Sequence, residues 1–254
     1  MRKRYASPDH PGVTVPETKR SWSVSFPEYS PVDITPEELR PAGLPKSVVD
    51  GWAEPFVTAN DVPDWSARQA LALLPFDLDE NGQPLNPTGR TGRCGRNLGK
   101  WGENAAADPI VVAGTGTDRR VLLIQRRDRG VWAIPGGMVD PGETAPKTLV
   151  RELHEETGVD LGDVQPTILA TTYVADWRNT DHAWVCTTAA LYELPEQVTA
   201  TAGDDAAAAR WWPFGDLDQL TDAVTAAGGH LYEAHRPLLA LALDTARQAD
   251  ASGF

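Results

Sequence analysis

The chain has 254 residues, a formal net charge of −13 at pH 7, and 41% hydrophobic and 23% charged residues, which are ordinary values for a globular protein. This length leaves room for two modest domains. An acidic chain repels the nucleic acid backbone at long range, so we expect no nucleic acid partner, and an anionic substrate would need local cations or a bound metal to enter.

The first residues give no sign of a membrane or export signal. The basic start at residues 1–4 leads toward Pro and Asp rather than an apolar core, and no apolar run approaches the ~18 residues that span a bilayer. We therefore expect a cytoplasmic, monomeric protein without a membrane partner. The two cysteines, Cys94 and Cys186, lie in no metal-ligand pattern, so neither a disulfide framework nor a zinc site is indicated.

Residues 1–106 are predicted to form an irregular N-terminal accessory domain of short strands. The segment is rich in Pro and Gly and shows little periodicity, but its aromatic residues are too many for a disordered tail: Trp22, Phe26, Tyr29, Trp52, Phe56 and Trp65. Within it, residues 89–102 interleave cations with glycines. This stretch could face phosphates, with Arg96 as a candidate, or it could be a flexible basic linker, and the pattern alone does not decide.

Residues 107–254 are predicted to form an α/β/α sandwich with a mixed sheet. Alternating and β-branched runs indicate strands, and helices fit 146–156, with Pro in the first turn and Gly158 as the stop, and 235–249, with leucines and alanines on one face. Strands flanked by a few helices favour this layered fold. The predicted strands are 110–113, 121–126, 131–134, 167–173 and 183–192.

The helix at 146–156 carries a stripe of carboxylates. At about 100° per residue, Glu152, Glu155 and Glu156 fall within about 100° of one another, so they share one face. Such carboxylates repel unless they are solvated or hold divalent cations, and Mg²⁺ or Mn²⁺ prefers oxygen ligands of this kind. The glycines before the helix allow a sharp turn that can aim a backbone carbonyl at the same cations. An ordinary acidic surface helix is the alternative.

The surrounding pattern decides between these readings. Residues 137–159 read GMVDPGETAPKTLVRELHEETGV, which satisfies every position of the Nudix signature: Gly, five residues, Glu, seven residues, Arg-Glu, an aliphatic, any residue, Glu-Glu, any residue, Gly, an aliphatic. A chance match in a chain of this length has a probability on the order of 10⁻⁷. The chain is identified as a member of the Nudix hydrolase family by this resemblance.

The resemblance implies a role for each matching residue. Glu152 and Glu156 would be the main metal ligands, and Glu155 a further or water-linked ligand. Gly136, or its neighbour, would lend a carbonyl. Glu143 and Arg151 would stabilise the loop.

Similarity outside the signature points to the mitochondrial-type ADP-ribose pyrophosphatases of animals, a group related to the ADP-ribose-sensing domain of a melastatin-type cation channel. It lies in the stretches from Gly89 to Pro109, 132–143, 176–184 and 203–206, and near Trp22 to Tyr29. The resemblance implies hydrolysis of ADP-ribose to AMP and ribose 5-phosphate with Mg²⁺ or Mn²⁺. A hydrolase of another nucleoside diphosphate derivative and a non-hydrolysing ADP-ribose sensor are the alternatives.

Candidate substrate-binding residues lie on one loop after a strand. Asp176 and Arg178 suit ribose hydroxyls and phosphate respectively, and Asn179 and Asp181 share their loop. A salt-bridged surface turn is the alternative reading.

A candidate for the water-activating base is Asp204 or Asp205, because relatives of this fold place an acidic residue on the loop that faces the signature helix. On pattern alone, an Asp-Asp pair is an ordinary turn.

The remaining aromatic and imidazole side chains indicate structure more than chemistry. The histidines, at positions 10, 154, 182, 230 and 235, form no ligand spacing, and His154 is expected to face solvent. Trp132, Trp184 and the Trp211-Trp212 pair, the latter expected at a strand start, are interpreted as core residues. The sequence does not determine which phosphorus is attacked or which metal is physiological.

Overall fold

The computed structural model describes residues 12–140, 142–203 and 206–252. The chain divides into two compact units, of which the first comprises Met1–Ala105 with Tyr173–Cys186 and the second Ala106–Thr172 with Thr187–Phe254. The predicted domain division between residues 106 and 107 stays a prediction. A segment from the second half of the chain thus contributes to the first unit.

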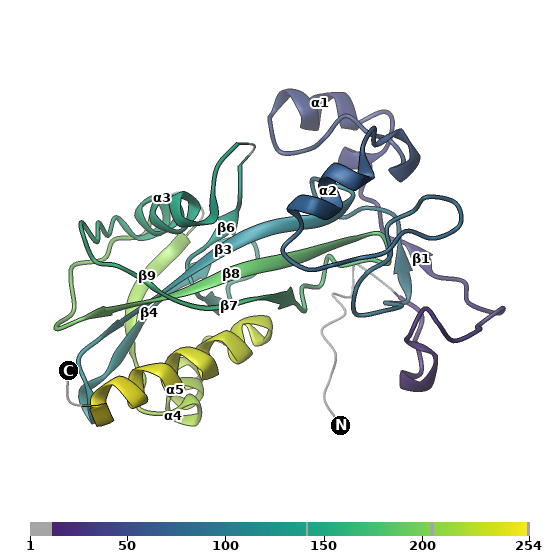
Figure 1. The fold of residues 1–254 in the computed structure, drawn as a ribbon. Helices are drawn as coiled ribbons and strands as arrows, with labels where there is room; N and C mark the ends of the chain where they lie inside the picture. Colours follow the sequence, from purple (N-terminus) through teal and green to yellow (C-terminus); the bar gives the residue numbers. More distant parts are fainter. Residues whose placement is uncertain (1–11, 141, 204–205, 253–254) are drawn as a thin grey trace. The chain divides into compact units, whose positions relative to one another are not determined.

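The main sheet, most of whose residues belong to the second unit, has the strand order β5-β4-β3-β8-β7, in which β6 also pairs with β3 and β9 with β4 (Figure 1). The strands are β3 (Gly102–Ala113), β4 (Arg120–Arg126), β5 (Trp132–Ala133), β6 (Gly137–Met138), β7 (Thr167–Val174), β8 (Ala183–Leu194) and β9 (Ala206–Pro213). The helical segments are η4 (Gly116–Asp118), α3 (Ala145–Thr157), α4 (Leu217–Ala226), η5 (Glu233–His235) and α5 (Arg236–Ser252).

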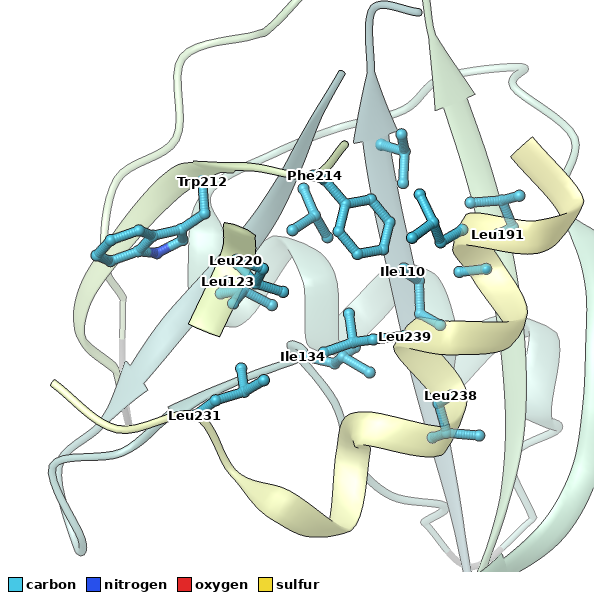
Figure 2. Packing of buried hydrophobic residues seen from close by; sticks show 14 of the residues in the cluster. Ile110, Leu123, Ile134, Leu191, Trp212, Phe214, Leu220, Leu231, Leu238 and Leu239 are labelled. Atoms are coloured by element: carbon cyan, nitrogen blue, oxygen red, sulfur yellow. The ribbon is translucent and has the colours of Figure 1, made fainter. Parts of the chain in front are cut away.

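Strand alternation separates two cores on the two faces of this sheet. Val111 belongs to the core that contains Leu149 of α3, whereas its neighbour Val112 belongs to the core that contains Leu239 of α5. Helix α3 therefore covers one face, and α4 and α5 cover the other (Figure 1). Figure 2 shows the second core, in which the rings of Phe214 and Trp212 lie among aliphatic side chains from strands and helices. The predicted α/β/α sandwich with a mixed sheet is confirmed.

Two helices agree closely with the sequence pattern. Helix α3 begins at Ala145, with Pro in its first turn, and ends at Thr157. The next residue, Gly158, has a φ of 64°, the left-handed conformation that glycine adopts without a Cβ penalty. Helix α5 begins at Arg236. Within the described residues, no helix combines the length and apolar character that crossing a bilayer requires.

Several strands differ in their limits from the sequence expectations. Strand β3 begins at Gly102 rather than at residue 110, although its first half is rich in alanine. A strand was expected to start at Trp211-Trp212, but β9 begins at Ala206 and pairs with β4 from Arg120 to Arg126. As a result, Trp211 and Trp212 lie near the end of a strand rather than at its start. Their interpretation as core residues holds for Trp212, which is 1% exposed, while Trp211 is half-buried.

The first unit contains the predicted short strands, β1 (Val32–Asp33) and β2 (Arg93–Cys94), which pair in parallel. It also contains short helices that the sequence pattern did not predict: η1 (Glu17–Lys19), η2 (Glu37–Leu39), α1 (Leu44–Val49), η3 (Ala59–Asp61) and α2 (Trp65–Leu71). Side chains hold these pieces together. Arg90 is buried, donates hydrogen bonds to the carbonyl oxygens of Lys19 and Ser21 at 2.9 and 2.6 Å, and lies over the rings of Trp22 and Tyr29.

Candidate active site

Helix α3 presents three carboxylates toward the turn that precedes it. The side chains differ in exposure: Glu152 is 13% exposed and Glu155 is 40% exposed, while Glu156 is buried. The adjoining face of the helix carries Leu149 and Leu153, both buried in the core beneath. This apolar face fixes the rotation of the helix, so the carboxylates are held beside the core, next to the turn at Gly136 and Gly137.

Arg151 organises the carboxylates around it. Its Nη1 donates to Glu152 Oε1 at 2.8 Å and to Glu155 Oε2 at 3.0 Å, and its Nη2 donates to Glu143 Oε2 at 2.9 Å. The same Nη2 reaches the carbonyl oxygen of Met138 at 3.2 Å. One guanidinium therefore ties β6, the loop after it and the helix into a single arrangement, because its fork of donors can serve several acceptors at once.

The acidic groups have opposite pKa shifts. Hydrogen bonds from Arg151, supported by the Thr148 hydroxyl, lower the pKa of Glu143 to about 2. Burial raises the pKa of Glu152, and the nearby guanidinium acts in the opposite direction. Glu143 is thus a fixed anion that anchors the arginine. Glu152, by contrast, is a partly desolvated carboxylate for which a further cation would be favourable.

The turn at Gly136 and Gly137 is fitted to these carboxylates. The N–H of Gly136 donates to Glu156 Oε2 at 2.8 Å. A Cβ on Gly137 would meet the carboxylate of Glu152, with its Oε2 2.6 Å away. Gly136 has a φ of +152°, and a Cβ there would meet Asp108 Oδ1 at 2.5 Å. Position 136 therefore needs glycine for its backbone conformation, and the absent side chain at Gly137 leaves the space in which the Glu152 carboxylate lies.

These residues fit a hard divalent cation. In the described parts of the chain, no group of three or more His, Cys, Asp or Glu side chains is already arranged to hold a metal ion, and Arg151 bridges Glu152 and Glu155. The donors are all oxygen atoms, and four carboxylates, of Asp140, Glu143, Glu152 and Glu155, lie within 4 Å of one guanidinium, which leaves a local excess of negative charge. The half-exposed Glu155 can turn toward a cation at small cost. The glycine turn supplies the close backbone approach.

The loop before β9 is bonded to the end of the same helix. Thr201 donates its N–H to the carbonyl oxygen of Thr157 at 2.8 Å, and Gly203 donates to that of Glu156 at 3.1 Å. These bonds satisfy carbonyl groups that the last turn of a helix leaves without partners. Asp204 and Asp205, the candidates for the base, lie outside the described residues.

Asp176 and Arg178 belong to the first unit, where they form a bidentate ion pair. Arg178 Nε donates to Asp176 Oδ1 at 2.9 Å and Nη2 donates to Oδ2 at 2.9 Å, and the backbone N–H of Arg178 also donates to Oδ1. The Asp176 side chain is 4% exposed and that of Arg178 is 26% exposed. The guanidinium is therefore the more accessible partner, and the carboxylate orients it.

The other substrate-binding candidates are buried within the same unit. Asp181 accepts from Tyr29 Oη at 2.6 Å and from both the N–H and the hydroxyl of Thr91 at 2.7 Å. Asn179 bridges the backbone of Val174 and Val185. Arg96 donates to the carbonyl oxygens of Glu54 and Gly99 and is 1% exposed. The structure gives each a place in the framework, and binding of substrate by these three stays a prediction.

Two residues near the glycine turn were missed by the sequence reasoning. His235 accepts a hydrogen bond from the N–H of Ile134, and its Nε2 lies 4.0 Å from Asp108 Oδ1. Both side chains are buried. Nothing in the local spacing of the histidines signals this role, because the partners are far apart in the sequence. His154 is exposed, as predicted.

Comparison with known families agrees with this fold. Residues 105–234 match the NUDIX domain, and residues 15–102 match the NUDT9-like N-terminal domain. The chain belongs to the Nudix family. Within that family, it combines the hydrolase domain with this particular N-terminal domain.

Relatives with known names share both parts. The chain is 35% identical to the mitochondrial ADP-ribose pyrophosphatase of Rattus norvegicus over 81% of its own length and 69% of that protein. It is 38% identical to the putative nudix hydrolase 6 of Caenorhabditis elegans over 78% of its length and 82% of that protein. A transient receptor potential cation channel, subfamily M member-like 2 of Nematostella vectensis, is 34% identical over 82% of the chain, which spans only 16% of the channel.

Proposed function

We propose that this protein hydrolyses ADP-ribose to AMP and ribose 5-phosphate at the carboxylates of α3. The observation that carries the proposal is the intact acidic cluster, in which Glu156 is bonded to the Gly136 turn and Glu152 lies against Gly137. Similarity to an ADP-ribose pyrophosphatase extends over both parts of the chain, which supports ADP-ribose over other diphosphates. In the reaction, water adds to one phosphorus, the bridging P–O bond breaks, and the leaving phosphate takes the oxygen and a proton.

We propose Mg²⁺ or Mn²⁺ as the cofactor, held by Glu152, Glu155, Glu156 and the carbonyl oxygen of Gly136. When bound, such a cation supplies positive charge against the diphosphate and makes water more acidic. This local charge would also offset the net charge of −13, which otherwise opposes the approach of an anionic substrate.

Hydrogen bonds within the protein hold the proposed metal ligands in place. Glu143 keeps Arg151 in place, and Arg151 in turn restrains Glu152 and Glu155 before substrate arrives. Such preorganisation matters because catalytic groups that are already aligned need not be ordered during the reaction. Asp204 or Asp205 is proposed to orient or deprotonate the attacking water. The cytoplasmic location and the monomeric state stay predictions.

A non-hydrolysing ADP-ribose sensor is the competing function, since the similar region of the cation channel belongs to a protein of another class. Glu152, Glu155 and Glu156 favour hydrolysis, because a protein that only binds ADP-ribose has no need for the whole carboxylate set. A hydrolase of another diphosphate derivative, such as a nucleotide sugar, is the second alternative.

The test is product analysis of ADP-ribose turnover with Mg²⁺ in ¹⁸O-labelled water. Formation of AMP and ribose 5-phosphate, with one labelled oxygen in one of the two products, is expected, and the labelled product identifies the attacked phosphorus. Saturable binding of ADP-ribose without turnover would establish the sensor instead. Preference for ADP-glucose or NAD⁺ by tenfold or more would establish another substrate.

A further inference from the structure

The segment before the glycine turn pairs with residues 230–232, which precede α5, in a short parallel ladder of hydrogen bonds. Trp132 donates its N–H to the carbonyl oxygen of His230 at 2.7 Å, and Tyr232 donates its N–H to the carbonyl oxygen of Trp132 at 2.7 Å. These bonds form a parallel bridge between Trp132 and Leu231. The next bond of such a ladder would run from the N–H of Ile134 to the carbonyl oxygen of Tyr232.

That carbonyl is used elsewhere. It accepts from the backbone N–H of His235 at 3.0 Å, which closes the turn η5. Ile134 donates instead to His235 Nδ1 at 3.1 Å. The imidazole therefore takes the place of the missing carbonyl and extends the ladder by one bond. The bond is buried, with His235 7% exposed and its ring edge-on to that of Tyr232 at 4.8 Å.

The second nitrogen of the imidazole, Nε2, lies near Asp108, a residue that contacts the turn at Gly136. Because Nδ1 accepts, the ring proton of the neutral imidazole is on Nε2, and Nε2 lies 4.0 Å from Asp108 Oδ1. Asp108 Oδ1 is the atom that a Cβ on Gly136 would meet at 2.5 Å. His235 thus holds the backbone at Ile134, two residues before Gly136. Asp108, which lies near His235 Nε2, is in direct contact with Gly136.

We propose that His235 is a positioning residue for the metal-binding turn, acting through Ile134 on Gly136. The inference rests on the proposed function of α3 and its turn. Ile134 and Gly136 are separated by Pro135, whose ring fixes φ, so a displacement at Ile134 is passed on to the N–H of Gly136. That N–H holds Glu156 at 2.8 Å. Groups that hold metal ligands in place change metal affinity about 10- to 100-fold when they are removed.

Three substitutions separate this role from that of an ordinary core histidine. His235→Asn keeps an acceptor as many bonds from Cα as Nδ1, whereas His235→Gln places its amide where Nε2 lies, and His235→Leu keeps only volume. The control is His230→Asn, because His230 is exposed and lies in the same segment. The measurement is the Mn²⁺ dissociation constant of the full chain without nucleotide, followed by electron paramagnetic resonance, with Tm recorded for each variant.

The expected ranking of Mn²⁺ affinities depends on whether the variant keeps an acceptor at the position of Nδ1. His235→Asn and His230→Asn should bind Mn²⁺ within about 3-fold of wild type, and His235→Gln and His235→Leu should bind it at least about 10-fold more weakly. Equal weakening by Asn and Gln, or Mn²⁺ affinity unchanged in all variants, would overturn the proposal. If the leucine variant does not fold, the comparison of Asn with Gln still decides.

The two proposals fail in different ways. Wild type that binds Mn²⁺ but does not cleave ADP-ribose would contradict the proposed function and leave the variant comparison valid. Wild type that binds no Mn²⁺ at these carboxylates would overturn the positioning role, because the turn would then hold no metal ligand.

Discussion

The backbone N–H of Gly136 donates a hydrogen bond to Glu156 Oε2 at 2.8 Å. This bond joins the turn before α3 to the last of its three carboxylates. It explains how a glutamate with only 8% of its surface exposed can remain charged, since a buried carboxylate needs donors to replace water.

The first prediction concerns the charge of Glu156. Glu156→Gln keeps an acceptor for Gly136 but removes the negative charge, so the protein should fold and kcat should fall at least ~100-fold, a loss of about 2.7 kcal/mol in transition-state stabilisation. The measurement is kcat for ADP-ribose at saturating Mg²⁺. The control is Glu193→Gln, at an exposed position on β8. Near-normal kcat in folded Glu156→Gln would exclude it as a principal ligand.

The accuracy of the sequence predictions follows from where each signal lies. Helix α3 was predicted to within a residue at each end, because Pro146 and Gly158 mark its limits locally. The start of strand β9 was missed because its first half is a run of alanines, which carries no strand preference, and its pairing with β4 along Arg120–Arg126 is a tertiary effect.

In the candidate site, too, local features were predictable from the sequence, whereas contacts between distant residues were not. The spacing of Glu152, Glu155 and Glu156 is local, so the shared face could be read from the sequence. The bond from Ile134 to His235 joins residues about a hundred positions apart, and no pattern near His235 marks it as an acceptor for that N–H. The burial of Asp181 was likewise unpredictable, since its partners Tyr29 and Thr91 are 152 and 90 positions away in the sequence.

The second prediction concerns the space at Gly137. A Cβ there would meet the Glu152 carboxylate, which can rotate away, so Gly137→Ala should leave Tm nearly unchanged and weaken Mn²⁺ binding about 10-fold. A double-mutant cycle with Glu152→Ala checks the cause, because the added methyl should have no further effect when that carboxylate is absent. Equal losses of affinity in both backgrounds would mean that the methyl acts elsewhere.

The third prediction is a pH dependence of stability. Hydrogen bonds from Arg151 lower the pKa of Glu143 from 4.5 to about 2, so its ionised form stabilises the fold at neutral pH. Because the folded-state pKa is the lower one, this contribution is complete well above pH 4.5 and is lost as the pH falls toward 2. Calorimetry in EDTA should therefore show a Tm deficit of Glu143→Gln that is largest near neutral pH and shrinks below about pH 4.5. A deficit independent of pH would contradict the assignment.

The fourth prediction tests the N-terminal part. In the first unit, Phe76 packs edge-on against Trp184 at 5.2 Å, and Asn86 donates to the carbonyl oxygen of Thr180 at 2.9 Å. Removing residues 1–88 would expose Trp184, which is fully buried, so the truncated protein should be poorly soluble. In the full chain, Phe76→Ala should cost about 3 kcal/mol in the free energy of unfolding. A soluble truncated enzyme with unchanged kinetics would show that this part is dispensable.

The last prediction concerns how Asp176 and Arg178 influence substrate choice. If Asp176 accepted hydrogen bonds from ribose hydroxyls, Asp176→Ala would reduce the preference for ADP-ribose over ADP, and Arg178→Ala would weaken both substrates. Instead, both oxygens of Asp176 are bonded to Arg178, and the carboxylate is 4% exposed, so we expect the pair to act as one unit. Each single variant should then lower kcat/KM for ADP-ribose and ADP alike by about 10-fold, and the double variant should be no worse than either, because the second substitution removes an interaction already lost. Asp176→Asn, which keeps the shape and one acceptor, should retain part of the activity.

The measurement is kcat/KM for both substrates in all four variants, with Mn²⁺ affinity as a control that none of them should change. Selective loss of ADP-ribose turnover in Asp176→Ala, with ADP unaffected, would instead show that the carboxylate recognises the sugar directly.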